Sequence, residues 1–116
     1  MDTTSNGDLF NDEDLAAYSS VIFLNTTMDV LNRHEEIAFE RYIQAGGGFV
    51  GVHAAADTEY GWAWYGDLVG AYFQSHPATQ EANFIIKDKA FAATSFFQDS
   101  VSVSYTHLTL PTIYSV

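Results

Sequence analysis

Two short runs of apolar residues flank a segment whose apolar positions recur at helical spacing. The run Val21-Ile22-Phe23-Leu24 is continuous and rich in β-formers, which is typical of a strand covered on both faces. A helix is predicted to begin at Asn32, and a second strand is predicted from Phe49 to His53, directly after Gly46-Gly47-Gly48. A strand, a helix and a strand with short connections predict a right-handed parallel βαβ unit.

The helix between these two strands has the clearest predicted ends. Asn32 followed three residues later by Glu35 resembles a capping box with Asn in the cap role. Gly46 is placed to end the helix in a left-handed conformation. The apolar stripe of the helix consists of Ala38, Phe39, Tyr42 and Ile43.

The rest of the chain gives weaker patterns. Residues 12–18 are predicted as a short helix that begins with acidic side chains, and residues 63–72 as a further helix. Residues 82–86 alternate weakly, as in an edge strand. The inward positions predicted for the 63–72 helix are Trp64, Leu68 and Ala71 or Tyr72.

Composition restricts the classes of partner. The chain has 116 residues, enough for one small domain, and its 15 acidic and 4 basic residues give a formal net charge of -11. A protein that binds nucleic acid or an anionic membrane needs a basic face, so neither partner is expected. The classes of partner that remain are neutral small molecules, cations or another protein. A homo-oligomer is also compatible with this composition.

Three absences in the sequence narrow the possible chemistry and the location. The chain has no cysteine, which excludes disulfides, thiolate metal sites and a cysteine nucleophile. It also has no apolar run of the ~20 residues that span a membrane. Residues 1–5 lack the basic and apolar regions of a signal peptide. As it reads, the sequence predicts a cytoplasmic protein, an expectation that a truncated N-terminus would remove.

The last residues read differently from the rest. Residues 101–116 contain no Asp, Glu, Lys or Arg, and they resemble the translation of sequencing-adapter DNA. We therefore predict a domain over residues 1–100 and a non-native tail over residues 101–116, and give His107 no functional weight. The alternative is a genuine terminal strand, because the segment has high β-propensity.

His53 is the first candidate for chemistry. Ligands of open α/β sheets bind just beyond the carboxyl ends of strands, and His53 stands at such an end. An imidazole there can act as a general acid or base, or bind a metal. The alternative is a structural histidine that is hydrogen-bonded to a neighbouring loop. The small residues Ala54-Ala55-Ala56 allow a following helix or a ligand to come close.

Asp57 and His76 are the candidate partners of His53. If the residues after His53 begin a helix, Asp57 shares one face with it and can orient the imidazole or bind a cation. The alternative for Asp57 is a helix N-cap. His76 precedes Pro77, which restricts its backbone, and the three side chains can complete a site for zinc or a similar divalent metal. Their spacing is not diagnostic, and His76 can equally be a loop histidine that caps a carbonyl.

Aromatic side chains gather just after this segment. Aromatic rings and carboxylates suit sugars, whose C–H faces stack and whose hydroxyls donate hydrogen bonds. Trp62 is the best stacking candidate because it follows Gly61 in an expected loop, whereas core packing is the alternative for Trp64 and Tyr65. Glu59 and Asp57 can also act as a carboxylate pair as in glycosidases, although their spacing is common. The candidate substrate-binding residues are Glu59, Tyr60, Trp62 and Trp64.

Several motifs together resemble the ThuA-like (trehalose-utilisation) family. The resemblance covers roughly residues 7–90, and its most specific part is the long segment from Gly46 to Asp57. The other matching segments are Leu15-Ala16-Ala17-Tyr18, Val21-Ile22-Phe23-Leu24-Asn25-Thr26-Thr27, Ala38-Phe39-Glu40-Arg41-Tyr42-Ile43, Trp64-Tyr65 and Phe73-Gln74-Ser75-His76-Pro77.

The resemblance implies a fold and a field of function. It implies an α/β, flavodoxin-like three-layer parallel sheet related to the class I glutamine amidotransferases, here partial and truncated at both ends. Those relatives carry a nucleophilic cysteine at the turn where this chain has His53, so glutaminase activity is not expected. The family implies metabolism of trehalose or related glycosides. An enzyme, a non-catalytic carbohydrate-binding or interaction module, and an inactive fragment all stay open.

Overall fold

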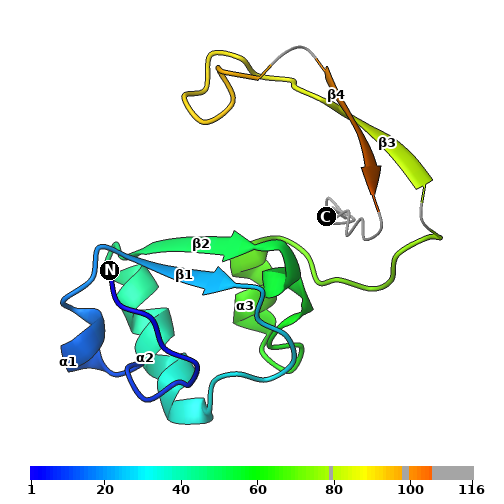
Figure 1. Cartoon of the computed structure of the whole chain (residues 1–116). Helices are drawn as coiled ribbons and strands as arrows, with labels where there is room; N and C mark the ends of the chain where they lie inside the picture. The colour runs from blue at the N-terminus through cyan, green and yellow to red at the C-terminus, as the bar shows by residue number, and fades with distance from the viewer. Residues whose placement is uncertain (79, 98–99, 106–116) are drawn as a thin grey trace. The chain divides into compact units, whose positions relative to one another are not determined.

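The structure is a computed structural model, and it describes residues 1–78, 80–97 and 100–105. The chain divides into two compact units (Figure 1). The first unit is Met1–Gln74, and the second begins at Ser75.

The first unit is built on the predicted βαβ arrangement. Strand β1 (Ser20–Leu24) and strand β2 (Gly48–Val52) are connected by helix α2 (Arg33–Gln44). The two strands pair in parallel, with Ser20 opposite Gly48 and Leu24 opposite Val52. His53, which we expected at the end of the second strand, is the first residue beyond it.

The predicted ends of α2 are confirmed. The Asn32 side chain accepts hydrogen bonds from the backbone N–H groups of His34 (2.9 Å) and Glu35 (3.3 Å). The Glu35 carboxylate in turn accepts the N–H of Asn32 at 2.7 Å, which completes the capping box. At the other end, Gly46 has a φ of 100°, the left-handed conformation expected of it.

Three shorter helices complete the unit. Helix α1 (Asp12–Leu15) is capped by Asn11, and the 3₁₀ helix η1 (His53–Asp57) follows β2 directly. Helix α3 (Ala63–Val69) ends before the predicted residue 72, because Gly70 adopts a left-handed φ of 84° and its N–H bonds back to Gly66 O.

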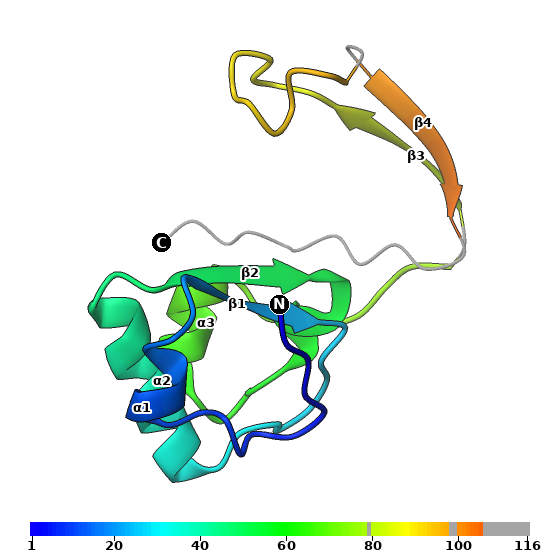
Figure 2. The same cartoon turned by 60° about the vertical axis from the view of Figure 1, so that its left-hand side comes forward.

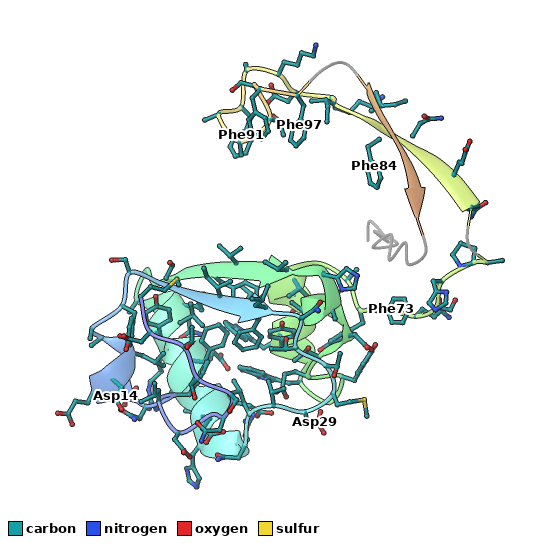
Figure 3. All side chains as sticks on the ribbon, in the orientation of Figure 1. Asp14, Asp29, Phe73, Phe84, Phe91 and Phe97 are labelled. Atoms are coloured by element: carbon teal, nitrogen blue, oxygen red, sulfur yellow. The ribbon has the colours of Figure 1, made fainter. Side chains whose placement is uncertain are left out.

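The helices cover one face of the sheet (Figures 1 and 2). Phe23 of β1 points into this layer and stacks on Phe39 of α2 at 5.5 Å and on Tyr65 of α3 at 5.7 Å between ring centroids. Figure 3 shows side chains filling the space between the strands and the helices. On the opposite face the side chains are exposed, so the strand predicted to be covered on both faces is covered on one in this unit. These exposed side chains are Ile22, Leu24, Val50 and Val52.

The second unit is an antiparallel pair of strands. Strand β3 (Gln80–Ile85) pairs with strand β4 (Ser100–Tyr105), with Gln80 opposite Tyr105 and Ile85 opposite Ser100. Strand β3 confirms the predicted edge strand. The first residues of the predicted non-native tail thus form a strand, residues 106–116 lie outside the described part, and the origin of the tail stays a prediction. Within the described residues, no helix is long and apolar enough to cross a membrane.

The capping box yields a first prediction. Replacing Asn32 with Ala removes the acceptor of two N–H groups and should lower the free energy of unfolding by about 1 kcal/mol. Asn32→Asp keeps a side-chain acceptor at the same position and should stay close to wild type. Urea denaturation followed by circular dichroism measures both. Equal losses for the Ala and Asp variants would contradict the capping role.

Candidate functional site

Strained backbone collects at the carboxyl ends of the two parallel strands. Among the described residues, the non-glycine residues with positive φ are Asn25 (60°), Met28 (63°), His53 (54°) and Glu59 (55°). The first two lie in the loop after β1, and the last two lie at and after the end of β2. Each such residue costs on the order of 1–3 kcal/mol and persists where its surroundings fix it, most often at functional sites. This edge of the sheet is therefore the candidate site.

His53 occupies the sharp turn between β2 and η1. Its residue is exposed, and no group in the described part of the chain hydrogen-bonds its imidazole. Among the described residues, no hydrogen bond thus supports the alternative of a structural histidine held by a neighbouring loop. The turn is tight because Gly51 leaves room for η1: a Cβ at Gly51 would lie 3.1 Å from the Cβ of Ala55. As expected, small residues let the chain fold back closely after His53.

Asp57 does not share a face with His53. The prediction assumed an α-helix, but η1 is a 3₁₀ helix, in which residues four apart are rotated by about 120°. The Asp57 carboxylate instead accepts a hydrogen bond from the Tyr60 hydroxyl, and its backbone carbonyl accepts the Met28 N–H at 2.8 Å. The N-cap alternative is also not met, since the cap of the next helix is Trp62.

Glu59 is buried and connects the two loops through hydrogen bonds of its carboxylate, a set of contacts here called the Glu59 clamp. The residue is 2% exposed, and its Oε1 accepts the backbone N–H groups of Val30 and Leu31, both at 2.8 Å. Its own N–H bonds to Met28 O at 3.0 Å. We expected Glu59 to line a sugar site or pair with Asp57. In the structure its carboxylate instead accepts backbone N–H groups of the segment before α2.

A residue that sequence reasoning missed strengthens the same connection. Thr58 is fully buried, and its Oγ1 lies 2.9 Å from Thr26 Oγ1 and 3.3 Å from Ala54 O. Thr58 also forms an isolated parallel bridge with Met28. The two loops therefore continue the parallel pairing beyond the strands. An expected loop threonine gives no local sequence signal for such a role.

The exposed ring of the aromatic cluster is Tyr60, not Trp62. Tyr60 is 44% exposed, whereas Trp62 is 6% exposed. A turn in which the Trp62 N–H bonds to Glu59 O at 3.0 Å brings the indole inward, where it stacks on Trp64 at 4.9 Å. Tyr65 is fully buried, and its hydroxyl donates to Ala55 O at 2.8 Å. Trp62, Trp64 and Tyr65 thus follow the core-packing alternative.

His76 belongs to the second unit. It is exposed, and its Nδ1 lies 3.1 Å from the carbonyl oxygen of Pro77. Its grouping with His53 and Asp57 stays a prediction. Over residues 1–78, 80–97 and 100–105, no three His, Asp or Glu side chains lie together as a metal site requires. In the first unit, one Asp57 oxygen is already engaged by Tyr60, and the Glu59 carboxylate accepts two backbone N–H groups.

The comparisons with known proteins agree with this fold. The family described as ThuA, trehalose utilisation, matches residues 1–111. A crystal structure of a ThuA-like protein from Bacteroides uniformis matches with 28% sequence identity and a TM-score of 0.74. The match covers 89% of this chain and 43% of that one. Among functionally curated proteins, none matches.

The Glu59 clamp predicts a pH-dependent stability. Burial raises the pKa of Glu59 above its ordinary value, and the charges of Asp29 and Glu36 act in the same direction, against the two backbone hydrogen bonds. The part of the stability that comes from this raised pKa is thus fully present below the ordinary pKa of Glu59 and is lost as pH rises through the raised value, whereas the two backbone hydrogen bonds remain. Glu59→Gln cannot ionise, so it should gain stability relative to wild type as pH rises from about 4 to 8.

Urea denaturation over this pH range measures the difference. Glu59→Ala, which leaves two amide groups without their acceptor, should lose roughly 2 kcal/mol or more at every pH. The exposed Glu13→Gln is the matched control, and its difference from wild type should stay nearly constant. A constant difference for Glu59→Gln as well would contradict the assignment.

The strained turn predicts an inverted order of two substitutions at His53. Glycine adopts a positive φ without a steric penalty, whereas alanine keeps the Cβ that causes it, so His53→Gly should be about 1 kcal/mol more stable than His53→Ala. At Val52, inside the strand, the order should be the ordinary one, with Ala above Gly. Thermal denaturation compares the four variants. An alanine variant more stable than glycine at residue 53 would show that the turn is not strained.

Proposed function

The chain belongs to the ThuA (trehalose utilisation) family, and we propose that it binds a carbohydrate at the carboxyl end of β2. The single observation that carries the proposal is the exposed imidazole of His53 on a left-handed residue, at a tight strand-to-helix turn. Such turns present functional side chains at the top of α/β sheets. The chain spans 43% of the similar structure, so the activity of a whole protein of this kind is also part of the proposal.

The proposed site has the chemistry that a neutral sugar requires. Sugar hydroxyls donate to carboxylates and to neutral imidazole nitrogens, and Asp57 and His53 supply these acceptors at one edge of the sheet. An imidazole can give or take a proton, so a sugar bound beside His53 would meet a candidate general acid or base. Tyr60 lies beside Asp57, and its hydroxyl donates a hydrogen bond to the Asp57 carboxylate.

One observation favours binding without turnover as a second candidate. A catalytic histidine is usually oriented by a carboxylate that accepts its ring N–H. Here the Asp57 carboxylate accepts from Tyr60, and the part of the chain described by the structure offers His53 no such partner. The enzyme and the binding module thus share one site and differ in whether the sugar is converted.

Calorimetry with trehalose tests the proposed site. Wild type should bind trehalose, and His53→Ala should raise the Kd at least tenfold because it removes the hydrogen-bonding ring. His34→Ala is the matched control, since His34 is an exposed histidine at the start of α2 and the cap uses only its backbone N–H. Sugar analysis after incubation separates the enzyme from the binding module. No heat with wild type, or equal Kd values for wild type and His53→Ala, would contradict the proposal.

A further inference from the structure

Tyr60 and Tyr72 form an interlocked pair, here called the tyrosine clasp. Their rings stack with centroids 5.0 Å apart and planes at 28°. Each hydroxyl reaches the backbone of the other's segment: Tyr60 Oη lies 2.8 Å from Phe73 O, and Tyr72 Oη lies 2.8 Å from Glu59 O. The clasp therefore holds the segment at Phe73, labelled in Figure 3, against the segment that follows η1.

The clasp gives the Tyr60 side chain little freedom. One face of its ring lies against Tyr72, and its hydroxyl contacts both Phe73 O and Asp57 Oδ1. The Phe73 backbone is itself fixed, because its N–H donates to Ala56 O at 2.7 Å. A ring held in this way is poorly suited to follow the shape of a sugar. It is well suited to hold a neighbouring group in place.

The group that Tyr60 holds is the Asp57 carboxylate. Burial raises the pKa of Tyr60 to about 12, and the hydrogen bond to Asp57 and the charge of that carboxylate add to the increase. The phenol therefore keeps its proton near neutral pH and acts as a constant donor. The backbone of Asp57 is anchored as well, through the bond from the Met28 N–H to its carbonyl oxygen.

The second carboxylate oxygen of Asp57 is left open. Within the described residues, Oδ2 accepts no hydrogen bond. In the same part of the chain no buried side-chain polar atom lacks a partner, so Oδ2 is open to solvent. A carboxylate with one oxygen fixed and the other open presents a directed acceptor and loses little rotational freedom when a ligand binds.

We propose that Tyr60 is a positioning residue, which fixes Asp57 Oδ1 so that Oδ2 accepts a hydroxyl of the bound carbohydrate. The inference rests on the proposed function, since it names the acceptor of the same site. It assigns Tyr60 a role different from a stacking surface: the hydroxyl, and not the ring face, contributes to binding.

The first test measures the Tyr60–Asp57 contact without any sugar. NMR of ¹³C-labelled tyrosine follows the phenol of Tyr60 through its titration. Asp57→Asn removes the charge beside the hydroxyl and should lower the pKa of Tyr60 from about 12 toward its ordinary value. Asp67→Asn, an exposed carboxylate of α3, is the matched control and should leave the Tyr60 titration unchanged. An unchanged pKa in Asp57→Asn would overturn the inference.

The second test is a double-mutant cycle with trehalose as the probe. Tyr60→Phe keeps the stacked ring and removes only the hydroxyl, and it should raise the Kd about tenfold. Asp57→Asn should raise the Kd at least as much, and the double variant should bind no more weakly than Asp57→Asn. A wild-type Kd for Tyr60→Phe beside a weakened Asp57→Asn would overturn the inference and leave the proposed function standing. Absence of trehalose binding by wild type would overturn the proposed function and this inference with it.

Discussion

The carboxylate of Glu59 is the contact on which the loops at the carboxyl end of the sheet depend. A nearly buried carboxylate is costly unless it is hydrogen-bonded, and here one oxygen accepts two backbone N–H groups from residues 30 and 31. This contact joins the segment after β2 to the segment that leads into α2. With the Thr58 hydroxyl and the bridge to Met28, it extends the parallel pairing beyond the last residues of the strands.

This connection explains how the candidate site tolerates its strained backbone. Left-handed non-glycine residues persist only where neighbouring contacts over-determine their conformation, and both loops are fixed from several sides. His53 is thereby held at the end of β2 with its side chain exposed. Stability and the proposed function oppose each other at this residue, because glycine would relieve the strain and remove the imidazole. The tyrosine clasp secures the other side of the site, next to Asp57.

The sequence predicts the local features of this fold well. The capping box of Asn32 and Glu35, the left-handed Gly46 and the parallel strand pair are encoded by neighbouring residues, so they can be read from short segments. The position of His53 follows from the strand that precedes it. Glu59 and Trp62 could not be placed in this way. The partners of the Glu59 carboxylate are 28 and 29 residues away, and Trp62 packs on Phe39 of another helix. The 3₁₀ geometry of η1, which separates Asp57 from His53, likewise has no clear signal in a run of alanines.

The central claim is that a carbohydrate binds at the carboxyl end of β2, and the most direct measurement is an NMR titration of the ¹⁵N-labelled chain with trehalose. The account predicts that the amide signals of residues 53–60 and of the facing loop at residues 25–28 shift together with one saturating curve. The N-terminal half of α2 and the helix α1 should stay unchanged. Shifts confined to those helices, or no shifts at trehalose concentrations that saturate sugar-binding proteins, would contradict the account.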